Sequence, residues 1–113
     1  VNDIDAANGA RVAAAIGAQA RFIQADVTRD ADWAQLVAAS VGAFGRLDVV
    51  VNNAGWTHRN KPFLEVGEDE FDRVYAVNVK SVYLAAKHAV PVFRCWSPRS
   101  GACSACFLPA KNA

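Results

Sequence analysis

Two acidic residues each follow a short apolar run, and their side chains suit the recognition of a nucleoside. Asp3 comes after Val1-Asn2, and Asp26-Val27 follows the run at residues 20–25. An ionised carboxylate only accepts hydrogen bonds, so Asp3 could hold ribose hydroxyls and Asp26 could hold an adenine amino group beside the Val27 amide. The charge of Asp3 would repel a 2′-phosphate, which favours NAD over NADP. The alternative for both aspartates is a helix cap.

A third polar segment, Asn52-Asn53-Ala54-Gly55, follows three consecutive valines. The small residues Ala54 and Gly55 would let the backbone approach a ligand closely, and the amide of Asn53 could tie neighbouring strand ends together. A turn alone would explain Asn-Ala-Gly, but it does not explain a doubled Asn directly after a buried strand.

Asn78 stands within an otherwise apolar stripe of a predicted helix. A buried amide must find hydrogen-bond partners or cost roughly 1–3 kcal/mol. We interpret Asn78 as a site residue that holds a water molecule useful to chemistry. The structural alternative is that it maintains a helix kink or a buried water.

The elements that must position these residues alternate between short strands and helices. The sequence predicts a strand that ends at Asp3 and two further strands, over residues 20–25 and over residues 47–51. It predicts a helix over Ala6–Ile16, stopped by Gly17, and a second helix that Thr28 or Asp30 caps and Gly45 ends. This alternation is typical of βαβ units and a parallel sheet. The carboxyl ends of parallel strands share one edge, so we expect the polar clusters to meet there.

The third helix is predicted over residues 68–93, and Pro91 should kink or end it. Its predicted core stripe contains apolar residues at spacings of three and four around Asn78. From Cys95 onward the sequence keeps no period, and we expect an irregular tail over residues 95–113. The members of the stripe are Phe71, Val74, Tyr75, Asn78, Val82, Ala85, Ala86, Ala89 and Phe93.

Composition excludes several classes of function. Hydrophobic residues make up 53% and charged residues 20% of the 113 residues, a balance typical of a globular protein. A formal net charge of +1, with scattered Lys and Arg, gives no basis for binding nucleic acid or a membrane surface. We expect a cytoplasmic protein. Zinc is not favoured, because Cys103-x-x-Cys106 with Cys95 and His88 lacks a second paired motif.

The segments GRLDVVVNNAG and FDRVYAVNVKSVYLAAKHAVP are very similar to the short-chain dehydrogenase/reductase family, and the resemblance covers Val1 to about Arg94. It implies a partial Rossmann fold, a doubly wound parallel α/β sheet in the order βαβαβα, over residues 1–94. It further implies an alcohol or carbonyl substrate and a homo-oligomer assembled through helix 68–93. Asn78 matches the helix Asn that holds a water in the proton relay, and the implied cofactor-binding residues are Asp3, Asp26, Val27, Asn53, Ala54 and Gly55.

The sequence also departs from the family pattern. The glycine-rich TGxxxGxG turn of the family precedes the strand that ends at Asp3, and its catalytic Ser and YxxxK pair lie beyond the matching segment. We therefore expect an internal fragment that is inactive alone, since hydride transfer needs that acid–base machinery. A methyltransferase-like domain and a non-catalytic interaction module are the alternatives. A methyltransferase, however, has no need of Asn53-Ala54-Gly55 with Asn78.

Overall fold

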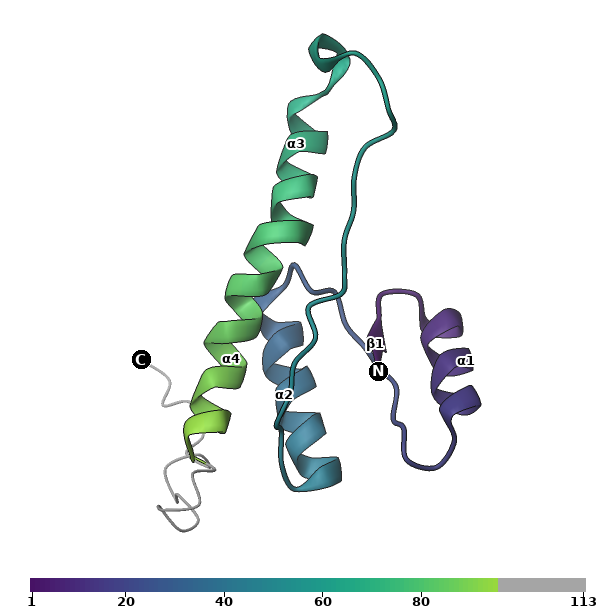
Figure 1. Ribbon diagram of the computed structural model, residues 1–113, viewed down its shortest axis with the longest axis vertical. Helices are drawn as coiled ribbons and strands as arrows, with labels where there is room; N and C mark the ends of the chain where they lie inside the picture. The colour runs from purple at the N-terminus through teal and green to yellow at the C-terminus, as the bar shows by residue number, and fades with distance from the viewer. Residues whose placement is uncertain (96–113) are drawn as a thin grey trace.

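The computed structural model describes residues 1–95. A long helical rod stands beside a shorter helix, and a small strand–helix unit lies to one side (Figure 1). The order begins with strand β1 (Asn2–Asp3), helix α1 (Ala6–Ile16), strand β2 (Ile23–Gln24) and helix α2 (Asp30–Phe44). The predicted first helix is confirmed at both ends, and Gly17 ends it with a positive φ of 94°.

Strands β1 and β2 pair in parallel, with Asn2 opposite Ile23 and Asp3 opposite Gln24. The Ile23 amide donates to the Val1 carbonyl over 3.1 Å, and the Ala25 amide donates to the Asp3 carbonyl over 3.2 Å. The strand predicted over residues 20–25 is shorter than expected, because it pairs only where β1 lies alongside it.

The third predicted strand, at residues 47–51, is not formed. These residues run back past α2 as irregular chain (Figure 1). The strand assignment was wrong because a strand is defined by its ladder of backbone hydrogen bonds, and residues 47–51 have no strand partner within the part of the chain that the structure describes. The observed order is therefore βαβα followed by helices, still a partial Rossmann arrangement.

The third helix is a continuous helical run over residues 68–95. It consists of α3 (Glu68–Tyr75), a five-residue π-helical turn η2 (Ala76–Lys80) and α4 (Ser81–Cys95), and a 3₁₀ turn η1 (Phe63–Glu65) precedes it. Pro91 lies inside α4, so the prediction that it ends the helix is wrong. Cys95 belongs to this helix and not to a tail. Residues 96–113, with Cys103 and Cys106, lie outside the described residues.

The buried face of this helical run differs from the predicted stripe. Ser81, Leu84, Ala85 and Ala89 are buried, whereas Asn78 is exposed. The half-buried Val77 and the buried Ser81 and Leu84 keep a spacing of three and four, but they lie one position before Asn78, Val82 and Ala85 of the predicted stripe. Much of the predicted stripe faces outward: Phe71, Tyr75 and Val82.

The core lies where α4 packs on α2. Trp33, Leu84 and Ala85 form a buried cluster, with Val27 and Val50 packed against it. The Trp33 indole N–H donates to the Val27 carbonyl over 2.9 Å, which joins the chain after β2 to the same cluster.

An ion-pair cluster adds a second connection between these two helices. Asp30 accepts from Lys87 over 2.6 Å and from His88 over 3.0 Å. The Lys87 ammonium and then His88 hold the pKa of the Asp30 carboxyl below its ordinary value. The prediction that Thr28 or Asp30 caps α2 is wrong, because Arg29 occupies the cap position and makes no side-chain cap bond.

We expect Gly9→Ala to destabilise the fold and Gly42→Ala to stabilise it. A methyl at Gly9, in α1, would lie 2.0 Å from the Phe22 ring, whereas one at Gly42, in α2, would meet nothing within 4 Å. Overpacking costs about 1–3 kcal/mol, and replacing Gly in a helix gains about 0.5–1 kcal/mol. Urea unfolding measures both, and equal effects of the two substitutions would contradict the packing of α1 on the chain before β2.

Candidate functional site

One pocket of about 410 Å³ brings together the polar clusters that follow the apolar runs. This volume is within the roughly 300–1,000 Å³ range of small-molecule sites. The ends of β1 and β2 supply one side of the pocket, and the chain after residue 51 supplies another. All six residues predicted from the sequence to meet a cofactor line it: Asp3, Asp26, Val27, Asn53, Ala54 and Gly55.

Asp3 is half-buried at the end of β1. Its Oδ1 accepts from the Asp5 amide over 2.9 Å, and its Oδ2 accepts from Asn8 Nδ2 over 3.5 Å. The cap of α1 is Asp5, whose side chain accepts from the Ala7 and Asn8 amides. Asp3 is therefore not the helix cap. A carboxylate has about four lone-pair positions, so Asp3 keeps capacity for further donors.

Asp26 is also half-buried, and it shapes the turn between β2 and α2. Its Oδ1 accepts from the Thr28 amide over 2.9 Å and from the Thr28 hydroxyl over 2.7 Å. Its own amide donates to Asp32 on α2 over 2.8 Å. The turn is thereby held by Thr28 within it and by Asp32 on α2. Among the described residues, the side chain of Asp26 makes its hydrogen bonds through Oδ1 alone.

Asn53, Ala54 and Gly55 are exposed along the pocket. Gly55 does not have a positive φ, so its conformation does not require glycine. A methyl at this position would lie 3.6 Å from Asn78 Oδ1, which is an ordinary van der Waals contact, so packing against the helix does not require glycine here either.

Both polar atoms of the Asn78 side chain form hydrogen bonds with the backbone of one loop residue, Trp56. Its Oδ1 accepts from the Trp56 amide over 2.9 Å, and its Nδ2 donates to the Trp56 carbonyl over 2.8 Å. The prediction of a buried amide is wrong, because Asn78 is exposed. It nevertheless has two protein partners, because the π-helical turn in which it lies brings its side chain to the chain just after Gly55. Asn78 therefore ties helix to loop.

The pocket is also lined by residues that the sequence reasoning did not single out as site residues, among them Trp56, Arg73, Val77 and Ser81. Arg73, Val77 and Ser81 recur every four residues on the helical run, and this spacing was a usable signal. Trp56 immediately follows Gly55, and the Arg73 guanidinium lies 4.4 Å from its ring centroid. This is a cation–π arrangement, and it closes the helix side of the pocket.

A Tyr-x-x-x-Lys spacing does occur in α4, at Tyr83 and Lys87. Neither residue lines the pocket. Tyr83 is 64% exposed, and Lys87 is bonded to Asp30. This pair therefore belongs to the outer face of the helix and its connection to α2.

Two other properties concern the described residues as a whole. No helix in residues 1–95 is long and apolar enough to cross a membrane. The same residues contain no group of three His, Cys, Asp or Glu side chains placed to hold a metal ion.

Comparison with known families identifies the class of protein to which this fold and pocket belong. A family profile described as Enoyl-(Acyl carrier protein) reductase matches residues 1–103. Among solved structures, a 3-ketoacyl-(acyl-carrier-protein) reductase from Brucella melitensis complexed with NADH is 40% identical, with a TM-score of 0.80 over 82% of this chain and 38% of that chain. The chain belongs to the short-chain dehydrogenase/reductase family of oxidoreductases.

Curated relatives are similar over part of their length. A 4-formylbenzenesulfonate dehydrogenase from Comamonas testosteroni is 59% identical over 68 residues, which cover 60% of this chain and 27% of the relative. An uncharacterized oxidoreductase from Thermotoga maritima is 42% identical over 93 residues, which cover 80% of this chain and 36% of the relative. The chain thus corresponds to about a third of the length of such relatives.

We expect Asn78→Ala to release the loop after Gly55 from the helix. Both bonds to Trp56 would be lost, at about 0.5–1.5 kcal/mol each, and the Trp56 amide should exchange with solvent faster. Hydrogen exchange followed by NMR measures this rate, and Asn60→Ala in the same loop is the control. An unchanged Trp56 exchange rate would contradict the assigned role of Asn78.

Proposed function

We propose that these residues form the adenosine-binding part of an oxidoreductase that uses NAD(H) and acts on an alcohol or carbonyl compound. The observation that carries this proposal is the convergence of all six predicted residues on one pocket. The similar reductase from Brucella melitensis, complexed with NADH, supports a nicotinamide cofactor.

The pocket residues fit an adenosine by their chemistry. Asp3 keeps lone pairs for two ribose hydroxyls, and its charge disfavours a 2′-phosphate. Asp26, with its Oδ2 without a partner among the described residues, and the neighbouring Val27 amide are suited to the adenine edge. Ala54 and Gly55 leave room for close approach of the ribose.

We assign Asn78 a positioning role in this proposal, because its side chain is committed to Trp56. The family role of holding a water stays a prediction. When bound, the nicotinamide exchanges a hydride with the substrate. A proton donor must act in the same step, and no Tyr-x-x-x-Lys pair lines the pocket. We therefore expect no change in NADH absorbance when these residues alone meet an alcohol.

The test of the cofactor proposal is the effect of Asp3→Asn on binding of NAD and NADP. The wild-type chain should bind NAD weakly, with a dissociation constant above ~1 μM, because no glycine-rich turn among these residues holds the pyrophosphate. It should prefer NAD over NADP. Asp3→Asn keeps an acceptor but removes the charge that repels the 2′-phosphate, so the preference should narrow by about tenfold, or ~1.4 kcal/mol.

The matched control is Asp5→Asn, which removes a charge two residues away while leaving a good helix cap. Isothermal titration calorimetry gives the dissociation constants of NAD and NADP, and hence their ratio, for each variant. An unchanged ratio in Asp3→Asn, or an equal change in Asp5→Asn, would refute the role of Asp3.

We also propose a homo-oligomer through the outer face of the helical run at residues 68–93. This face exposes large side chains spaced by about four residues, with Phe71 64%, Tyr75 56% and Tyr83 64% exposed. An apolar stripe of this kind marks an interaction surface. Sedimentation should show an assembly, and Tyr75→Lys should return it to monomers, whereas Arg59→Lys in the exposed loop should not. A monomeric wild-type chain would contradict the proposal.

A further inference from the structure

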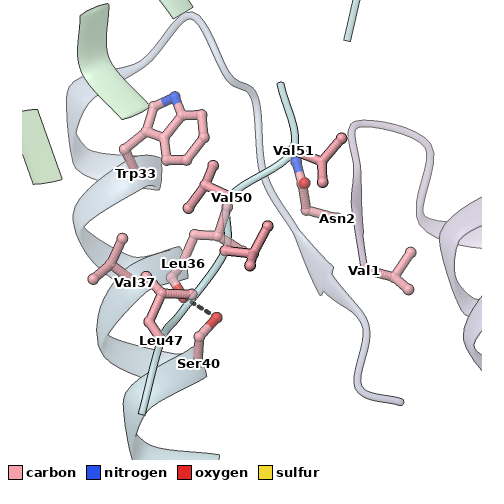
Figure 2. Close-up of a pocket in the computed structure, with 10 residues that line it drawn as sticks. Val1, Asn2, Trp33, Leu36, Val37, Ser40, Leu47, Val50 and Val51 are labelled. Atoms are coloured by element: carbon pink, nitrogen blue, oxygen red, sulfur yellow. Dashed lines mark hydrogen bonds between the residues drawn. The ribbon is translucent and has the colours of Figure 1, made fainter. Parts of the chain in front are cut away.

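Two tryptophans line the candidate cofactor pocket, and they differ in what surrounds them. Trp33 is buried, its indole N–H donates to the Val27 carbonyl, and Figure 2 shows it on α2 beside Val50. Trp56 is half-buried, and its indole N–H has no acceptor among residues 1–95. Its backbone is held by both hydrogen bonds from Asn78. Trp56 therefore occupies a fixed place in the pocket wall, with a hydrogen-bond donor to spare.

Arg73 lies over the Trp56 ring, with its guanidinium 4.4 Å from the ring centroid. A guanidinium carries five N–H donors in its plane, and a cation–π contact leaves most of them free for an acceptor. Within the part of the chain that the structure describes, the Arg73 side chain makes neither an ion pair nor a hydrogen bond. Its donors are therefore available to a ligand in the pocket.

The acidic residues of α3 do not neutralise Arg73. Asp69 precedes it by four residues, a spacing that suits an ion pair on a helix, yet no such pair forms. Glu70 is engaged by Lys61 and by the Gly67 amide instead. Neither Asp69 nor Glu70 lines the pocket. The pocket therefore keeps an unpaired positive charge on its helix side.

The charges that line this pocket are separated by sign. Asp3 and Asp26 belong to the strand ends, whereas Arg73 belongs to the helix. An anionic group is repelled by the two carboxylates and attracted by the guanidinium, so it takes the helix side. Guanidinium groups bind carboxylate and phosphate oxygens through paired N–H bonds, and the Trp56 indole adds one more donor.

We propose that Arg73, placed on Trp56, binds an anionic oxygen group of the ligand that fills this pocket, and so acts as a specificity-determining residue. The group is a carboxylate, a sulfonate or a phosphate. The inference rests on the proposed function for the identity of that ligand, because the group belongs either to the alcohol or carbonyl compound or to the dinucleotide. An uncharged compound gains no bond of this kind, so the site selects the charged one.

The test compares benzoate with benzamide, which has the same ring but no charge. Each compound is titrated into the full 113-residue chain at low ionic strength, and NMR follows the Trp56 indole and Arg73 Nε resonances. We expect benzoate to shift both resonances and to bind about fivefold more tightly than benzamide, the scale of an exposed ion pair. Added NaCl should weaken benzoate alone. Equal affinities, or no shift at Trp56 with benzoate, would overturn the proposal.

Two matched variants separate the pocket from the general charge of the surface. Arg73→Gln removes the charge at an exposed helix position, where Gln is also a good helix former, and the preference for benzoate should disappear. Arg59→Gln removes an equal charge from the exposed loop outside the pocket lining, and the preference should remain. An unchanged preference in Arg73→Gln, or the same loss in both variants, would show that Arg73 has no special role.

Binding of NAD and adenosine to the same variants identifies the source of the anionic group. If the group is the diphosphate of the dinucleotide, Arg73→Gln weakens NAD about fivefold, leaves adenosine unchanged, and benzoate displaces NAD. If the group belongs to the other reactant, Arg73→Gln leaves NAD unchanged, and benzoate binds beside NAD. A benzoate preference without any NAD binding would refute the proposed function and retain the anion site. NAD binding without a benzoate preference would overturn the anion site alone.

Discussion

The packing of α4 on α2 is the interaction on which the rest of the structure depends. Leu84 and Ala85 bury themselves against Trp33, and the Trp33 indole holds the Val27 carbonyl. Because Val27 belongs to the pocket and α4 continues from the turn that contains Asn78, this single cluster sets the distance between strand ends and helix. The ion pairs of Asp30 hold the same two helices at another point, but they are exposed and contribute less than the buried contact.

The hydrogen bonds between Asn78 and Trp56 then hold the loop in place beside the packed helices. Residues 52–55 have no element of their own, and an exposed loop without partners would sample many conformations. The two bonds between Asn78 and the Trp56 backbone fix the point where this loop leaves the pocket. The π-helical turn is what allows an exposed Asn to reach the loop while Leu84, two turns later, still faces α2.

The sequence predicted α1 and the polar edge of the sheet well, since both depend on local signals. Gly17 and the alanine-rich run specify the helix, and polar residues after apolar runs specify strand ends. The buried face of the third helix was misplaced by one position, because Val77, Ser81 and Leu84 have the same spacing as Asn78, Val82 and Ala85, and spacing alone does not decide between two adjacent stripes. The cap of α2 was predicted wrongly because the Thr28 hydroxyl donates to Asp26, two residues before it, and the Asp30 carboxylate accepts from Lys87 on α4.

Residues 47–51 show the limit of composition as a guide to strands. Val49, Val50 and Val51 have the intrinsic preference for a strand, yet pairing is a property of two segments and not of one. These valines line a cavity of about 260 Å³, which shares three lining residues with the candidate cofactor pocket: Asn2, Trp33 and Val51. The packing of Val51 and the position of Asn53-Ala54-Gly55 are therefore coupled, because the chain passes from one lining directly into the other.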